Sequence, residues 1–177
     1  MRLYKNAVGF ENVDAEFLYY KNYPEMSNFF GRPEVEERLK IEKEKLIVKC
    51  IKLDDFIDKE QIEKIDFLKI DTEGSELFVL RGCEKALSES KIKFLQFEAG
   101  GCLKDARVKL EDIFRLLAKY NYSVYRIASD GLIYLNKWYP ELENYLHANY
   151  LGISKDKGEE TLINFPVNPM EFNNDRI

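Results

Sequence analysis

Hydrophobic residues occur along this chain in short runs that polar, turn-forming segments separate. The run at 65–70 (IDFLKI) places apolar groups on both faces, which is typical of a strand that is covered on both sides. Two similar runs, at 46–51 and 92–97, also predict strands. Apolar residues at 110, 113, 114 and 117 follow the spacing of one helical face and predict a helix there.

The remaining segments predict further elements, and their order indicates the fold class. We expect strands at 3–8, 15–20 and 150–153 and a loop at 21–33. We expect helices at 34–44, at 53–57 with Asp54 as N-cap, at 75–88 with a break at Gly82, and at 141–146. Residues 124–127 and 132–135 should form a hairpin around Asp130-Gly131. From residue 62 onward, strands and helices alternate before the hairpin begins. This order predicts an α/β fold whose parallel sheet is finished by an antiparallel strand.

Length and composition narrow the class of protein. A chain of 177 residues fits one domain. We place that domain at 1–154 and interpret the polar, aperiodic residues 155–177 as a C-terminal tail. The net charge of −5 argues against nucleic acid as a partner, because phosphate binding needs clustered Lys and Arg.

Cysteine usage and hydropathy bear on the compartment. The three cysteines are Cys50, Cys83 and Cys102, an odd number without CxxC spacing, which favours reduced core residues over a disulfide scaffold or a zinc site. No apolar run approaches the ~20 residues that a membrane span needs, and no basic-then-apolar leader is visible. We therefore expect a cytoplasmic protein.

Three carboxylates follow two neighbouring predicted strands. Asp71 and Glu73 come directly after 65–70, and Glu98 ends the run at 92–97. Because the ends of adjacent parallel strands lie about 5 Å apart, the three acids should share one rim of the sheet. There they could accept a proton from a substrate hydroxyl or hold a divalent cation, although we assign no residue as a metal ligand. The alternative is that Asp71 or Glu73 caps the helix that begins near Ser75.

Other chemistry-bearing residues have plainer interpretations. Lys69 lies within an apolar strand and is expected to form a structural ion pair, with a substrate contact as the alternative. His147 is expected to be a packed or surface residue, with catalysis as the less favoured alternative. The aromatic residues between 19 and 30 are expected to pack in the core and loops, and the alternative is a surface that binds a sugar or a base.

At these residues the chain resembles the FkbM family of S-adenosylmethionine-dependent methyltransferases. The resemblance spans roughly residues 5–155 and is most specific at KIDTEGSE. It rests on NAVGF at 6–10 followed by AEFLYY, LDDFI at 53–57, IDFLKIDTEGSELFVLRGCEKAL at 65–87, FLQFE at 94–98 and HANYLGISK at 147–155.

The resemblance implies a Rossmann-like methyltransferase sheet in the order 3-2-1-4-5-7-6, mostly parallel and with an antiparallel C-terminal hairpin. It implies methyl transfer from S-adenosylmethionine to a hydroxyl of a small molecule, a sugar, a glycan or a natural product. Asp71, Glu73 and Glu98 are the implied catalytic residues on the acceptor side. Ala7 and Val8, together with Asp71, are the implied cofactor-binding residues.

The chain also departs from the family pattern. The family's first strand ends in a glycine-rich turn resembling DxGANxG, and its second strand ends in an acid that binds the ribose. This chain starts at about the third strand, and no Gly-x-Gly occurs in it. Without the first two strands, the apolar strand 65–70 would have an open edge that invites pairing.

These observations leave two hypotheses and a less favoured third. The first is an FkbM-like methyltransferase whose sheet is completed by a partner chain or by a missing N-terminal segment. The second is a non-catalytic module that pairs through the exposed strand edge. The third is a glycan-processing enzyme in which the spacing of Asp71 and Glu98 would set the stereochemistry.

Overall fold

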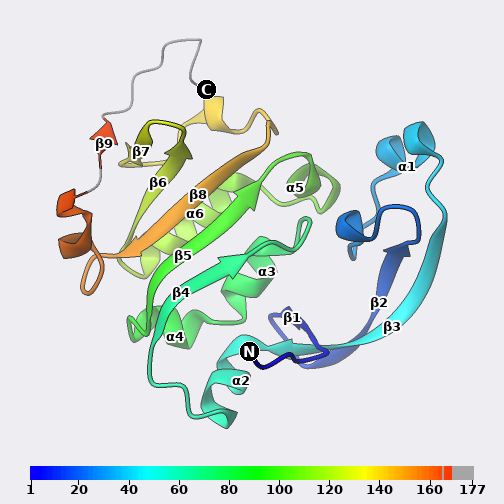
Figure 1. Ribbon diagram of the computed structural model, residues 1–177, viewed down its shortest axis with the longest axis horizontal. Helices are drawn as coiled ribbons and strands as arrows, with labels where there is room; N and C mark the ends of the chain where they lie inside the picture. Colours follow the sequence, from blue (N-terminus) through cyan, green and yellow to red (C-terminus); the bar gives the residue numbers. More distant parts are fainter. Residues whose placement is uncertain (165, 169–177) are drawn as a thin grey trace.

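The computed structural model describes residues 1–164 and 166–168 of the chain, which form two β-sheets and six α-helices (Figure 1). The strands are β1 (Ala7–Gly9), β2 (Val13–Tyr20), β3 (Lys43–Lys52), β4 (Ile65–Ile70), β5 (Ile92–Ala99), β6 (Tyr122–Ala128), β7 (Gly131–Leu135), β8 (Ala148–Ser154) and β9 (Val167–Asn168). The α-helices are α1 (Pro33–Leu39), α2 (Leu53–Lys59), α3 (Glu76–Arg81), α4 (Glu84–Ser88), α5 (Gly101–Asp105) and α6 (Leu110–Lys119). Short 3-10 helices are η1 (Pro24–Met26), η2 (Pro140–Leu142) and η3 (Glu159–Asn164). None of the described helices has the length and apolar character that a membrane crossing requires.

The larger sheet has six strands in the order β4-β5-β8-β6-β7-β9. β4 and β5 are parallel, but β8 runs antiparallel to both β5 and β6. The predicted hairpin is confirmed as β6 and β7, which are antiparallel. The α/β class is therefore correct, whereas the prediction of a mostly parallel sheet is wrong. The sheet is mixed because β8, the last long strand, inserts between β5 and β6 in the opposite direction.

The smaller sheet has the order β1-β3-β2 and projects to one side of the larger one (Figure 1). β2 and β3 form a long antiparallel ladder from Val13–Cys50 to Tyr20–Lys43. β1 pairs in parallel with β3 and has no other strand partner among the described residues. Likewise β4 pairs only with β5, so the predicted open edge of 65–70 is present in the described chain.

The helices cover one face of the larger sheet. Figure 1 shows α3, α4 and α6 behind the strands, and the main core lies in this layer. It contains fully buried residues such as Leu80, Leu95, Phe97 and Leu117. The strand register puts residues 95, 97 and 99 of β5 on this face and residues 94, 96 and 98 on the other.

We call that other side of β4 and β5 the open face. It carries no helix at β4 and β5 in Figure 1, and Phe67 of β4 is 53% exposed on it. Further along the sheet, a smaller cluster of Tyr125, Leu132 and Ile153 covers it together with Leu162 of η3. The open face thus leads directly to the ends of β4 and β5, where the acidic residues lie.

Several predicted boundaries change for local reasons. The helix predicted at 34–44 ends at Leu39, because Lys40 adopts a left-handed conformation (φ 51°) and residues 43–50 pair with β2. The hairpin turn is at residues 129–130, since Gly131 already pairs with Ala128. The strand at 150–153 begins earlier, at Ala148, and the helix at 141–146 is only the 3-10 turn η2.

The break at Gly82 between α3 and α4 is confirmed and has a steric cause. A Cβ atom on Gly82 would lie 1.9 Å from the carbonyl oxygen of Gly9, so the close passage of β1 requires glycine here. This contact, together with a hydrogen bond from the Asp54 amide to the Gly82 carbonyl (2.8 Å), ties the smaller sheet to the helical layer.

Asp54 was predicted to cap α2, and the structure corrects this. Its carboxylate accepts hydrogen bonds from the amides of Lys85 and Ala86, each at 2.9 Å, and therefore caps α4 instead. Asp54 is only 4% exposed, so it links two helices from within the core.

The predicted tail is described in part. Residues 159–164 form η3, and residues 167–168 form β9, which pairs in parallel with β7. Residue 165 and residues 169–177 of that prediction lie outside the described residues. The domain boundary at 154 stays a prediction.

Candidate functional site

Strand register brings Asp71, Glu98 and His147 to one corner of the open face. In the β5–β8 ladder Glu98 lies opposite Asn149, and His147 precedes Asn149 by two residues. Glu98 and His147 are therefore diagonal neighbours on the same face. Asp71 follows β4 in the parity of Phe67 and Lys69, so it emerges on that face as well.

A cleft of about 410 Å³ lies at this corner. It contains the three predicted acids and several residues from other parts of the chain. Its lining is Glu25, Arg32, Asp71, Glu73, Glu98, Gly100, Gly101, Cys102, Tyr145 and His147. The predicted acids thus line one rim, whereas Ala7 and Val8 do not reach this cleft.

Each of the three predicted acids lies close to a basic side chain. Nζ of Lys69 lies 2.6 Å from Oδ2 of Asp71, which confirms the ion pair predicted for Lys69. Nη1 of Arg32 lies 3.2 Å from Oε2 of Glu73. Nε2 of His147 lies 2.8 Å from Oε1 of Glu98.

Burial gives Glu73 a distinct electrostatic environment. Loss of solvent raises the pKa of the Glu73 carboxyl, and the charge of Arg32 opposes that rise. The neighbouring carboxylates Glu98, Glu76 and Asp71 raise the pKa of Glu73 further. Arg32 also lies 3.3 Å from Oδ2 of Asp105, so it is held between α5 and the acidic loop.

The loop from Asp71 to Ser75 is held in shape by Glu76, which the sequence interpretation did not single out. Oε1 of Glu76 accepts hydrogen bonds from the Thr72 amide (3.0 Å), the Thr72 hydroxyl (3.0 Å) and the Gly74 amide (3.3 Å). Glu73 (φ 52°) and Gly74 (φ 109°) both have positive φ, which makes a sharp turn that exposes the Glu73 side chain to the cleft.

This geometry does not support the helix-capping alternative for the two acids. Among the described residues, the carboxylates of Asp71 and Glu73 contact Lys69 and Arg32, and neither accepts a hydrogen bond from an amide of α3. The two carboxylates are therefore turned toward the cleft and its cations.

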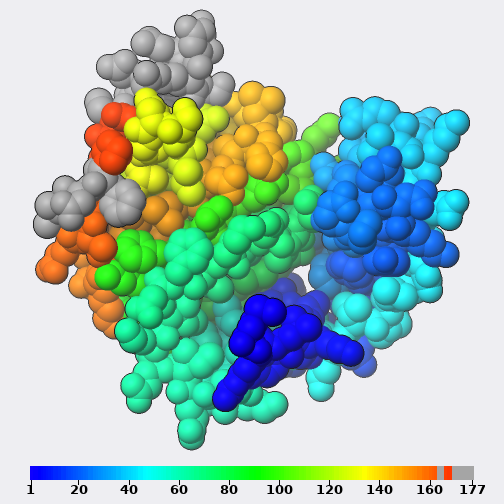
Figure 2. Space-filling view, viewed as in Figure 1, coloured from blue at the N-terminus to red at the C-terminus, as the bar shows by residue number. Residues whose placement is uncertain are grey.

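A second groove adjoins the cleft on the other side of the loop. Its volume is about 480 Å³, and its lining includes Ala7 and Val8 of β1 and Asp71, Thr72 and Ser75. Figure 2 shows the dark blue N-terminal residues lying beside the teal surface that contains β4, with a hollow between them. Asp71 is the residue that borders both the cleft and this groove.

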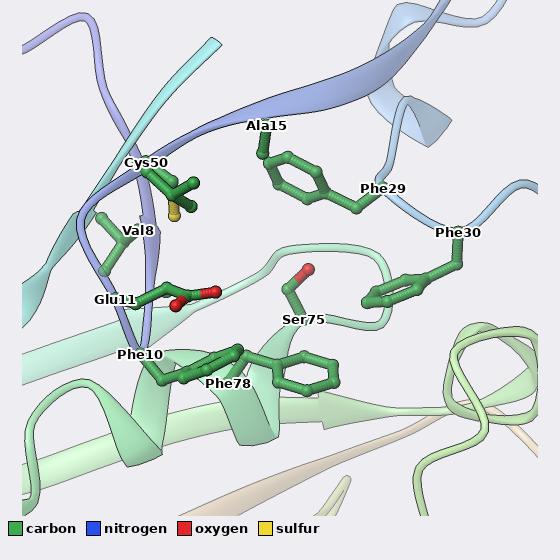
Figure 3. Close-up of a pocket in the computed structure, with 11 residues that line it drawn as sticks. Val8, Phe10, Glu11, Ala15, Phe29, Phe30, Cys50, Ser75 and Phe78 are labelled. Atoms are coloured by element: carbon green, nitrogen blue, oxygen red, sulfur yellow. The ribbon is translucent and has the colours of Figure 1, made fainter. Parts of the chain in front are cut away.

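An apolar cavity of about 170 Å³ lies behind the same loop (Figure 3). Phe10 and Phe30 pack against Phe78 with ring centroids 5.7 and 5.5 Å apart. Figure 3 shows the hydroxyl of Ser75, a residue that is only 4% exposed, pointing into this cavity. Phe29 and Phe30 of the predicted aromatic group therefore line this cavity, and Tyr20 is fully buried.

The surroundings of the three cysteines favour core packing over reactivity. All three are free and buried. Burial raises the pKa of both Cys83 and Cys102 to about 12, which disfavours the thiolate, even though Cys102 lines the cleft. Among the described residues, no group of three or more His, Cys, Asp or Glu side chains has the arrangement of a metal site.

Comparison with known proteins gives one match. Residues 5–124 match the family model described as Methyltransferase FkbM domain, and this range is more than half of the chain. The chain therefore belongs to the FkbM methyltransferase domain family. The segment at 147–155 that also resembles the family lies outside the matched range. Searches of curated proteins and of solved structures each gave no match.

Proposed function

We propose that this chain forms the acceptor side of an S-adenosylmethionine-dependent methyltransferase that methylates a hydroxyl oxygen of a sugar, a glycan or a natural product. Membership of the family supports methyl transfer as the reaction class. The observation that carries the rest is the convergence of Asp71, Glu73 and Glu98 on one cleft.

The chemistry of the cleft suits a polar acceptor. Carboxylates accept hydrogen bonds, so they can orient the hydroxyl groups of a polyol. The side chains of Asp71, Glu73 and Glu98 are 45%, 21% and 19% exposed, which leaves their oxygens accessible to a bound molecule. Methyl transfer mainly requires that the acceptor oxygen be correctly placed and lose its proton.

We propose that Asp71 lies between the bound acceptor and the methyl donor. It borders the groove that also contains Ala7 and Val8, the residues proposed to flank the donor. A donor in this groove would supply an electrophilic methyl group close to the mouth of the cleft.

The described residues fit only one flank of such a donor. The groove is open, and the chain contains no Gly-x-Gly turn to surround the methionine part. β4 and β1 both have a free edge on the described chain, and residues near each of them line the groove. We therefore propose that strands from a partner chain or from an N-terminal segment pair there and complete the donor site.

The strand order is consistent with this proposal. The sequence β4-β5-β8-β6, with β8 antiparallel, corresponds to strands 4-5-7-6 of the expected Rossmann-like sheet. β1 corresponds to the third strand of that sheet. Between them the expected order has two strands that have no counterpart among the described residues.

The proposal is tested by methyl transfer. The chain should be isolated from its own cells under mild conditions, so that any polypeptide paired with β4 is retained, and given radiolabelled S-adenosylmethionine with a panel of glycosides. We expect transfer to a hydroxyl and a loss of at least about 100-fold in Asp71→Asn, because the acceptor oxygen would no longer be held in place. Asp66→Asn is the matched control, because Asp66 is an exposed acid of β4 that does not line the cleft. Absence of transfer, or equal loss in both variants, would contradict the proposal.

A second candidate function is a non-catalytic module that pairs through β4. The exposure of Phe67 on an open strand edge favours it. Light scattering during size-exclusion chromatography separates the two candidates. A stable complex that transfers no methyl group supports the module, and a monomer that transfers methyl groups excludes it.

A further inference from the structure

We infer that His147 takes the proton from the acceptor hydroxyl, and that Glu98 positions its imidazole. This inference rests on the proposed function, and it assigns a catalytic role to a histidine for which the sequence favoured a packed or surface position over catalysis. The structural basis is the close contact of His147 with Glu98 at the rim of the cleft.

The other candidate bases of the cleft are less suitable. Nζ of Lys69 lies 2.6 Å from Asp71, and Nη1 of Arg32 lies 3.2 Å from Glu73, so an oxygen of each carboxylate is already paired with a cation. A substrate hydroxyl would have to compete with that cation for the oxygen. Imidazole is the side chain whose chemistry is best matched to proton transfer near neutral pH.

The fold determines where the imidazole sits. His147 directly precedes β8, and the β5–β8 ladder places it diagonally across from Glu98. The Glu98 carboxylate, only 19% exposed, lies 2.8 Å from Nε2 of His147. A carboxylate at this position favours the tautomer that carries its proton on Nε2, which leaves Nδ1 as the free acceptor.

Nδ1 is available for a substrate. Among the described residues His147 contacts Glu98 through Nε2, and no hydrogen bond of Nδ1 is present there. The side chain of His147 is 68% exposed and lines the cleft, so a bound hydroxyl can reach it.

The proposed reaction moves one proton and one methyl group. The O–H bond of the acceptor breaks, and its proton forms an N–H bond with Nδ1 of His147. With a sulfonium methyl donor bound, the oxygen electron pair would form the new bond to the methyl carbon, and the electron pair of the methyl–sulfur bond would go to sulfur. The resulting imidazolium lies beside the Glu98 carboxylate, which stabilises its charge until the proton leaves to solvent.

The first test needs no methyl transfer. His147 is the only histidine of the chain, so nitrogen-15 NMR of the full-length protein shows one imidazole. We expect the proton on Nε2, and we expect the Nδ1 resonance to shift when methyl β-D-glucopyranoside is added. Glu98→Gln should shift the tautomer ratio and weaken the response to the glycoside. A proton held on Nδ1, or ring nitrogens that do not respond to the glycoside, would overturn the inference.

The second test uses the methyl-transfer assay with the natively isolated protein. We expect His147→Gln to lower kcat at least about 100-fold with little change in KM, and Glu98→Gln to lower it about 10-fold. Leu146→Gln is the matched control, since it introduces the same side chain at an exposed neighbouring position outside the cleft. If His147→Gln keeps more than half of kcat, the inference is wrong.

The two tests separate this inference from the proposed function. A positive NMR result with an inactive wild-type protein would reject methyl transfer while retaining His147 as a hydroxyl-binding residue. An active wild-type protein with an unaffected His147→Gln variant would retain the proposed function and reject the role of His147.

Discussion

Glu76 provides a sharp test of how the acidic loop is held. Its side chain is fully buried, and its Oε1 accepts three hydrogen bonds from Thr72 and Gly74. Its Oε2 has no partner among the described residues. Burial raises the pKa of Glu76 above the ordinary value of 4.5, and the hydrogen bonds oppose that rise.

The raised pKa of Glu76 determines how the stability of the fold changes with pH. A carboxyl whose pKa is higher in the folded state stabilises the fold most below the ordinary pKa. That stability is lost as the pH rises from about 4.5 through the raised pKa, because the folded protein must then bury a charge. Glu76→Gln keeps an oxygen acceptor and removes the charge, so this variant should not lose the part of the stability that ionisation of Glu76 costs the wild type over this range.

The hydrogen bonds of Glu76 set the size of the expected change in unfolding free energy. Glu76→Ala removes three hydrogen bonds worth about 1 kcal/mol each, so we expect a loss of about 3 kcal/mol. With a urea m-value of about 2 kcal/mol/M, the unfolding midpoint should fall by about 1.5 M. Glu76→Gln should stay within about 1 kcal/mol of the wild type at pH 7.5.

The assay is urea unfolding at pH 5 and pH 7.5, followed by circular dichroism. We expect the wild type to lose stability relative to Glu76→Gln between these two pH values. If Glu76→Gln were as unstable as Glu76→Ala at pH 7.5, or if the two pH values gave the same difference from wild type, the reasoning would be refuted.

Three other substitutions test the fold and the cleft. Asp54→Ala should destabilise the protein by about 2 kcal/mol in chemical unfolding, because two buried helix amides lose their acceptor; an unchanged midpoint would exclude the capping role. Gly82→Ala should cost about 3 kcal/mol in thermal unfolding, because its Cβ would overlap the Gly9 carbonyl; a wild-type Tm would show that β1 does not pass so close. Arg32→Gln should raise the pKa of Glu73 further, since the lost cation opposes the effect of burial; carbon-13 NMR of the Glu73 carboxyl in the full chain measures this, and a lower pKa would contradict the assignment.

Much of the fold follows from local pattern. The strand at 65–70, the helix at 110–119 and the break at Gly82 have signals within a few residues, and all three are present. The direction of the last long strand has no such signal. It depends on the pairing of β8 with β5, about 50 residues away, which periodicity does not encode.

Some features of the cleft could likewise be predicted from the sequence, and others could not. The convergence of Asp71 and Glu98 could be predicted, because both acids follow adjacent strands. Arg32 could not be predicted, since it lies in a loop 41 residues before its partner Glu73. Glu76 carried a local signal that the interpretation missed, namely an acid four residues after Thr72 at the start of a helix.

The contact of His147 with Glu98 illustrates the limit of a single sequence. A lone histidine carries no motif, and its place beside Glu98 depends on the β5–β8 register. Only the tertiary structure shows that the single imidazole of the chain lies among the acids of the cleft.

The central claim is that this chain carries the acceptor cleft but only one flank of the donor site. Calorimetric titration of the isolated 177-residue chain with S-adenosylmethionine tests it most directly. We expect no measurable binding, because the chain has no Gly-x-Gly turn to surround the methionine part of a donor in this groove. Micromolar binding by the isolated chain would contradict the claim, since this chain alone would then form a complete cofactor site.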